Sequence, residues 1–341
     1  MNPLLNLGYC CINTELQAQK IFCSRTMRLA TFRIKGLAYA QELALQNLRD
    51  LLTILQWNQE HGITAFRVSS DLFPLADHPE CGYSLDFAQD LLAEVGAYAR
   101  QHQHRLTMHP GQFHVLTAKT DKIIKATVAG LEYHCDILDR MGMDKQSIMV
   151  IHGGGVYGDK PAALARLEEN LLRLKENVRN RLVLENCEMA YNIEDLLPIS
   201  RKLKIPIVID YHHDSIHPSS KPPEFYHEEV FQVWDSRGIK PKVHVSQSVP
   251  DVNMNSINSR RKHSDYIDVL PDALLKLNRF VDVMFEAKKK ELSVLRYREM
   301  TAAPATIVKK ASKKKLSETT APEEAVPEAK QVAKKRKTRA V

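Results

Sequence analysis

The sequence lacks the short motifs that identify cysteine metal sites, disulfide frameworks and nucleotide-binding folds. Its six cysteines show no C-x-x-C spacing, which argues against a cysteine zinc site and indicates the reduced thiols of a cytosolic or nuclear protein. No G-x-G-x-x-G or G-x-x-x-x-G-K-[ST] follows an apolar run. No apolar run approaches the roughly 20 residues of a membrane span. No basic region precedes the first apolar stretch, so we expect neither a membrane span nor a secretory signal.

An excess of charge is also missing from most of the chain. Lys and Arg total 48 against 41 Asp and Glu, a net charge of +7 over 341 residues. Residues 301–341 carry 11 of the basic and 4 of the acidic side chains, which leaves 37 of each sign in residues 1–300. Any anion binding by residues 1–300 must therefore come from the local arrangement of side chains rather than from overall charge.

Residues 301–341 form a Lys/Arg-rich tail with few large apolar residues and no aromatic ones. Such a segment cannot bury enough surface to offset the entropy that ordering costs, so we expect it to be disordered. Two basic clusters, Lys309–Lys315 and Lys334–Arg339, flank an acidic stretch that contains proline. These clusters fit electrostatic contact with nucleic acid, a nuclear address, or a solubilising tail with no specific partner.

Eight apolar, β-rich runs alternate with amphipathic segments through residues 1–300. The runs are residues 4–10, 64–70, 105–110, 147–154, 181–188, 205–213, 242–247 and 280–288. Segments such as 43–62 and 84–102 place apolar residues at i, i+3, i+4 and i+7, as helices do. The alternation predicts a single α/β domain, a (β/α)₈ TIM barrel, with a doubly wound open sheet as the competing architecture. The missing nucleotide-binding motifs favour the barrel.

Polar side chains follow these runs at the point where each strand is expected to end. The third to the eighth runs end at or near His109, His152, Glu185, Asp210 with His213, His244 and Glu286. Loops on the same face offer His78, and His263 with Asp265. Because the carboxyl ends of barrel strands converge on the face where active sites are built, we expect these side chains to lie together.

Several of these residues together indicate more than any one of them does. A single buried histidine is more often a hydrogen-bonded core residue than a ligand, and a single glutamate after a strand often caps a helix. Three carboxylates among apolar strands, however, are costly to bury without a compensating cation. Imidazole and carboxylate without thiolate suit Zn²⁺, Mn²⁺ or Fe²⁺, and the ligands outnumber those of one tetrahedral ion. The pattern therefore predicts two or three divalent ions.

Nine short motifs carry a resemblance to a known family. They are LGYCCIN (7–13), RVSSDLFPLADHP (67–79), HPGQF (109–113), IHGGG (151–155), LEN (184–186), DYHH (210–213), KVHVS (242–246), HSDYI (263–267) and FEAKKKE (285–291). In this order they resemble the UV damage endonuclease family, whose members are related to endonuclease IV and share the xylose-isomerase-like barrel.

The resemblance implies an endonuclease that nicks double-stranded DNA immediately 5′ to a UV photoproduct by attack of a metal-activated hydroxide. Mn²⁺ is the expected ion, with Zn²⁺, Co²⁺ and Mg²⁺ as alternatives. The implied ligands are His109, His152 and Glu185 for one ion, Glu185, Asp210, His244 and Glu286 for a second, and His213, His263 and Asp265 for a third, with His78 alongside. Glu185 would bridge two ions, and Lys242, two residues before His244, would point into the same site.

The resemblance also implies residues that contact the lesion. A photodimer is weakly stacked and paired, so extruding it costs less than extruding normal bases. Gln112 and Phe113 match a Gln-Tyr pair that fills the resulting gap, and Tyr9 and Asn13 match further lesion-contacting positions. Phe113 keeps the stacking face of the expected tyrosine but lacks its hydroxyl group.

Three other functions stay open at the level of the sequence. An endonuclease-IV-like enzyme for abasic sites would use the same metals, a sugar isomerase or epimerase would use the same barrel, and a DNA-binding scaffold would have lost catalysis. The HPGQF motif favours photoproducts, and the full ligand set argues against a scaffold. We expect a monomer that acts on DNA in the cytoplasm of a prokaryote or in the nucleus of a eukaryote.

Truncating the chain at Thr301 should lower its affinity for all DNA and flatten the salt dependence of binding. The reason is that residues 301–341 hold the whole net charge of +7, and each phosphate contact adds about 0.9 to the slope of log K against log[salt]. Binding isotherms of both chain lengths at several salt concentrations measure the slope. An unchanged slope would show that the tail does not touch phosphate.

Overall fold

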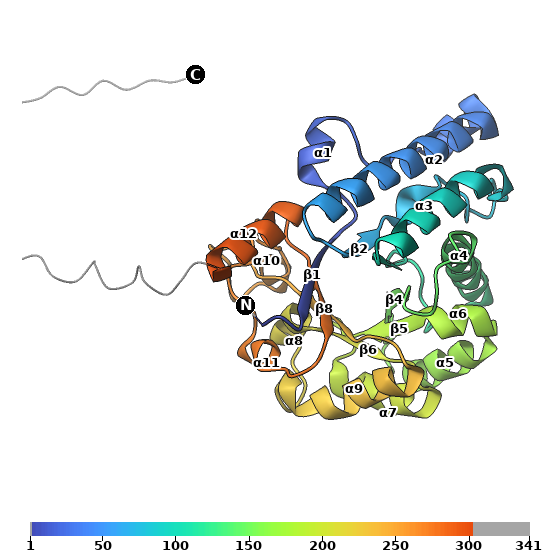
Figure 1. Ribbon diagram of the computed structural model, residues 1–341. Helices are drawn as coiled ribbons and strands as arrows, with labels where there is room; N and C mark the ends of the chain where they lie inside the picture. The colour runs from blue at the N-terminus through green and yellow to red at the C-terminus, as the bar shows by residue number, and fades with distance from the viewer. Residues whose placement is uncertain (1, 303–341) are drawn as a thin grey trace, which may run out of the picture. The chain divides into compact units, whose positions relative to one another are not determined.

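A computed structural model describes residues 2–302, so nearly all of the predicted tail lies outside the described residues. The strands are β1 (Leu5–Cys10), β2 (Ala65–Val68), β3 (Arg105–Met108), β4 (Met149–His152), β5 (Leu182–Glu185), β6 (Ile207–Asp210), β7 (Lys242–Val245) and β8 (Val281–Phe285). Neighbours in the sequence pair in parallel, and β1 also pairs with β8, which closes the sheet. The predicted TIM barrel is confirmed (Figure 1).

Helices surround the barrel (Figure 1). They are α1 (Thr14–Ala18), α2 (Leu29–Glu60), α3 (Gln89–Gln101), α4 (Asp121–Arg140), α5 (Lys160–Arg173), α6 (Glu176–Arg181), α7 (Ile193–Leu203), α8 (Tyr211–Ile216), α9 (His227–Arg237), α10 (Ile257–Arg260), α11 (Asp272–Leu275) and α12 (Lys290–Ala302), with 3₁₀ turns at Ser70–Leu72, Asp86–Ala88 and Pro223–Tyr226. Both helices expected at 43–62 and 84–102 are present, but α2 begins well before the first range. Among the described residues, no helix combines the length and the apolar character that crossing a membrane requires.

Alternating residues of the strands face two different environments. Val243 and Val245 of β7 belong to the apolar core between the sheet and the helices. Lys242, one residue before Val243, donates a hydrogen bond of 2.8 Å to Thr107 across the inside of the barrel. His244 on the same side of β7 reaches the metal-ligand candidates. The period of two therefore gives the barrel a polar interior that leads up to the carboxyl ends of the strands.

Gly8 allows β1 and β2 to approach each other closely. A Cβ atom at this position would lie 2.2 Å from the carbonyl oxygen of Ala65 in β2. No side chain fits at that distance, which explains the glycine in the LGY motif.

Candidate metal centre

Strand pairing brings the predicted ligands to one level at the mouth of the barrel. His152 at the end of β4 is the register partner of Glu185 at the end of β5. Asp210 at the end of β6 is likewise paired with His244 of β7. His109 and Glu286 directly follow β3 and β8. The side chains group as His109–His152–Glu185, Glu185–Asp210–His213 and Asp210–His244–Glu286, each with its ligand atoms within 4.8 Å of one another.

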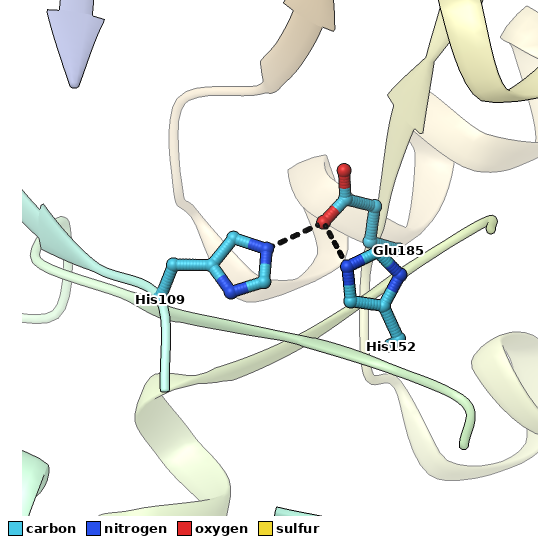
Figure 2. A group of neighbouring side chains, drawn as sticks. All are labelled: His109, His152 and Glu185. Carbon is cyan, nitrogen blue, oxygen red and sulfur yellow. Dashed lines mark hydrogen bonds and ion pairs between the residues drawn. The ribbon is translucent and has the colours of Figure 1, made fainter. Parts of the chain in front are cut away.

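Glu185 lies at the centre of these groups and is 1% exposed. One carboxylate oxygen, Oε2, lies 2.8 Å from His109 Nε2 and 3.6 Å from His152 Nε2. Figure 2 shows both imidazole rings directed at this oxygen. The other oxygen, Oε1, lies 2.8 Å from His244 Nδ1. Burial opposes ionisation of this carboxyl group, but the surrounding imidazoles hold its pKa well below the usual value. A fully buried carboxylate thus keeps its negative charge at the point where three strands deliver imidazoles.

Asp210 and His244 each have a buried polar atom without a hydrogen-bond partner. Asp210 caps α8, because its Oδ1 accepts a hydrogen bond of 2.8 Å from the backbone N–H of His213. Its Oδ2 and the Nε2 atom of His244 are buried without a hydrogen-bond partner. Burial raises the pKa of the Asp210 carboxyl group to about 7, although His213 opposes the shift, and burial lowers the pKa of His244 to about 4. Buried polar atoms without partners are rare and call for an unseen ligand such as an ion.

The donor set fits divalent metal ions. Each group combines imidazole nitrogens with carboxylate oxygens, and none of the groups in the described residues contains a cysteine. Nitrogen and oxygen ligands of this kind suit Zn²⁺, Mn²⁺ and Fe²⁺. Glu185 belongs to two of the groups, and its bridging of two ions stays a prediction.

Glu188 is a candidate ligand that the sequence prediction missed. It forms a fourth group with His152 and His213, and its Oε2 lies 3.6 Å from His213 Nε2. Arg261 also pairs with Glu188 at 2.5 Å. The signal was present in the sequence, since a second acid follows Glu185 by three residues in LENCE.

The predicted third set of ligands is not brought together as expected. His213 joins His152 and Glu188, whereas His263 lies beside His212 with 5.3 Å between ring centroids. A cavity of about 280 Å³ next to the metal centre is lined by both His213 and His263.

Asp265 and His78 lie away from the centre. The Asp265 side chain is 56% exposed and lies 4.0 Å from Lys288. His78 accepts a hydrogen bond of 3.2 Å at Nδ1 from the backbone N–H of Glu80. Neither residue belongs to a metal-binding group among the described residues.

Two cations lie inside the barrel close to the ligands. Arg67 of β2, which the sequence prediction also missed, forms a partly buried ion pair with Glu286. Burial opposes ionisation of Glu286, but Arg67 and His244 lower its pKa. Lys242 is 1% exposed and binds Thr107, and burial followed by repulsion from Arg67 lowers its pKa to about 7. Lys242 therefore points into the barrel, where its partner Thr107 is one layer below the ligands.

The Gln112–Phe113 pair lies on the rim of the site. Phe113 is 82% exposed, and Gln112 lines a largely apolar cavity of about 440 Å³ together with His152 and Glu188. The loop is anchored by His114, whose Nδ1 atom lies 3.0 Å from the carbonyl oxygen of Gly111. An exposed aromatic ring thus stands beside a cavity that opens at the metal centre.

Tyr9 and Asn13 do not lie where DNA could reach them. Both side chains are 0% exposed. The Tyr9 hydroxyl group donates to Asn58 of α2 at 2.6 Å and accepts a hydrogen bond of 3.1 Å from Asn13. The expectation that they contact the lesion is therefore corrected: in this structure they fix the end of β1 and the start of α1 from within the core.

Comparisons with known proteins agree with this geometry. The model of the family "UV-endonuclease UvdE" matches residues 5–317. The UV-damage endonuclease of Schizosaccharomyces pombe is 38% identical over 299 residues, which cover 84% of this chain and 49% of that protein. The UV DNA damage endonuclease of Bacillus mycoides is 34% identical over 259 residues, 74% of this chain and 80% of that protein. The chain thus spans about half the length of the first relative and most of the second.

A solved structure agrees as well. The crystal structure of SacUVDE superimposes with a TM-score of 0.78 at 28% identity, covering 87% of this chain and 98% of that one. The barrel, the ligand groups at its mouth and the match over residues 5–317 lead to the same assignment. The chain belongs to the UV-endonuclease UvdE family.

Proposed function

We propose that this chain is a metal-dependent UV-damage endonuclease that cuts one strand of double-stranded DNA immediately 5′ to a photoproduct. The observation that carries the proposal is the convergence on Glu185 of imidazoles and carboxylates from the neighbouring strand ends. Family membership supports the substrate class. The proposed active form is a monomer, and its place of action is the cytoplasm of a prokaryote or the nucleus of a eukaryote.

The ligand groups define what the chain would hold. One ion would be bound by His109, His152 and Glu185, a second by Glu185, Asp210, His244 and Glu286, and the group His152, Glu188 and His213 offers a third position. Bound divalent ions would supply an activated water nucleophile and neutralise charge on the phosphoryl oxygens. We propose Mn²⁺ as the native ion, as the resemblance to the family implies, and the nitrogen and oxygen donors without thiolate are compatible with it.

The surrounding residues orient the ligands. The backbone N–H of His213 fixes one oxygen of Asp210 and leaves the other free for a ligand. Arg67 holds the carboxylate of Glu286 by a partly buried ion pair. Lys242, anchored to Thr107 below them, would add positive charge beneath the scissile phosphate, and we assign it a positioning role. Such preorganised charges cost no rearrangement when the reaction occurs.

Recognition of damage would use the rim loop. A photodimer leaves the base stack at lower cost than normal bases, and the cavity of about 440 Å³ beside the metal centre offers space for extruded bases. The exposed ring of Phe113 would stack in the gap that they leave, with Gln112 beside it.

Metal analysis combined with a nicking assay tests the proposed function. The protein should carry more than one divalent ion per chain and nick UV-irradiated duplex far faster than the same duplex unirradiated. A chelator should abolish nicking, and Mn²⁺ should restore it. Faster cutting of an abasic duplex than of the irradiated one would replace the proposal by an endonuclease-IV-like activity. Nicking that survives complete removal of metal would contradict it.

A further inference from the structure

One stretch of positive charge is not used by the proposed chemistry. Residues 16–41 contain five basic side chains and no acidic one, although residues 1–300 as a whole are balanced. The five are Lys20, Arg25, Arg28, Arg33 and Lys35. We call residues 19–39 the basic arm; it comprises the segment after α1 and the N-terminal part of α2.

The basic arm lies on the same face of the barrel as the metal centre. It follows the carboxyl end of β1, and α2 then runs back along the barrel to the start of β2, so its N-terminal end is on the mouth side. Arg33 pairs at 2.6 Å with Glu80, in the segment between β2 and α3, which is also a mouth-side loop. Figure 1 shows α2 running outward from the strands.

The N-terminal end of α2 is not packed into the core. Ile34 is 85% exposed, and the residues from Arg33 to Lys35 are all exposed. Gly36 interrupts the helix with a φ of 74°, so Leu29–Lys35 leave the line of the rest of α2. At about 1.5 Å per residue Leu29–Lys35 account for about 10 Å of α2, which has 32 residues in all against 20 in α4.

Three cations of the arm are free to meet a partner. Arg25 is paired with Asp50 and Arg33 with Glu80. Lys20, Arg28 and Lys35 are exposed, and none forms an ion pair within residues 2–302. Lys35 lies over the ring of Tyr39, 3.9 Å from its centroid, which holds the side chain in place without neutralising it.

We propose that the basic arm binds the phosphate backbone of duplex DNA to one side of the lesion, and this inference rests on the proposed function. Unpaired lysine and arginine side chains spread along an exposed segment match a line of phosphates. Phosphate contacts fix the position of a protein on a duplex without reading its sequence. The arm therefore sets the register of the DNA, while the metal centre cuts it.

The test is a charge-removing variant of the full chain, Lys20→Gln with Arg28→Gln and Lys35→Gln. The matched control is Lys145→Gln with Lys240→Gln and Lys276→Gln, which removes the same charge. Each control lysine is exposed and precedes β4, β7 or β8, so the three lie at the opposite end of the barrel. Lesion duplexes with flanks of about 5 and about 15 base pairs on either side, a half-turn and one and a half turns, serve as ligands.

The arm variant should bind the long-flank duplex on the order of tenfold more weakly and lose up to about 2.7 from its salt slope, about 0.9 for each contact. Shortening one of the two flanks should weaken DNA binding by the wild-type protein. The wild-type protein and the arm variant should then bind with equal affinity. The maximal nicking rate at saturating DNA should not change, and neither should binding by the control. The melting temperatures of both variants verify that they fold.

Two results would overturn the inference. One is an equal loss of affinity in the control and the arm variant, and the other is a loss that does not depend on flank length. Binding to undamaged duplex tests this inference separately from the proposed function. The arm should contribute to the salt slope of binding to undamaged duplex as well, because phosphate contacts do not require a lesion. A protein that binds undamaged duplex through the arm but never nicks irradiated DNA would contradict the proposed function alone.

Discussion

Replacing Glu185 by glutamine should reduce nicking by far more than the roughly 100-fold that losing an outer-shell partner costs a metal site. Glutamine keeps the shape of the side chain but removes the charge that faces His109, His152 and His244. With that charge gone, two of the four ligand groups lose their shared carboxylate. The barrel itself should stay folded, because its core lies outside the ligands.

Single-turnover nicking rates and the metal content of the same preparations measure this effect. Glu291→Gln is a matched control, since Glu291 is also fully buried but accepts hydrogen bonds from the backbone N–H groups of Thr14 and Glu15 instead. It should lower the melting temperature by loosening α1 and leave the nicking rate of folded protein unchanged. Wild-type turnover by Glu185→Gln with full metal content would show that the carboxylate does not bridge ions.

Changing Gln112 and Phe113 together to alanine should lower discrimination for damaged duplex roughly 10- to 100-fold. This range corresponds to the loss of one base–aromatic stacking interaction, about 1–3 kcal/mol. The 82% exposure of Phe113 means that the change leaves no cavity in the core, so stability should be nearly unaffected.

The readout is the ratio of kcat/KM on irradiated and unirradiated duplex rather than the rate on either one. Phe280→Ala is the control, because Phe280 is also exposed, at 63%, but precedes β8 at the opposite end of the barrel. The ratio should fall in the double variant and stay at the wild-type value in the control. An unaltered ratio in the double variant would remove the stacking proposal.

The main features of the fold and the ligands could be predicted because they depend on local patterns. An apolar run that ends in His, Asp or Glu marks both a strand and the position of its polar end, as at His152, Glu185 and Asp210. The topology of a barrel then brings such ends together without further information. The same logic placed Lys242 on the inner side of β7, two residues from His244.

The errors concern residues whose role depends on distant partners. The buried Tyr9 donates a hydrogen bond from its hydroxyl group to Asn58, 49 positions later in the chain. No local pattern in the sequence reveals this pairing. Arg67 pairs with Glu286 from β8, again far along the chain. Glu188 lies beyond the end of β5, where the loop turns it back toward His213. The first turns of α2 were missed because helices are predicted from apolar residues that recur at helical spacing on a core-facing side. In these turns the apolar residue Ile34 is exposed instead.

The seam of the barrel joins Leu5–Cys10 to Val281–Phe285, and its paired residues, such as Leu5 and Val281, are 276 positions apart along the chain. A polypeptide leaves the ribosome with its N-terminal part first, so one edge of the first strand stays unpaired until the last strand has emerged. Glu286 arrives only after that strand, and it completes the group with Asp210 and His244. This ligand group is therefore complete only when nearly the whole barrel has been translated.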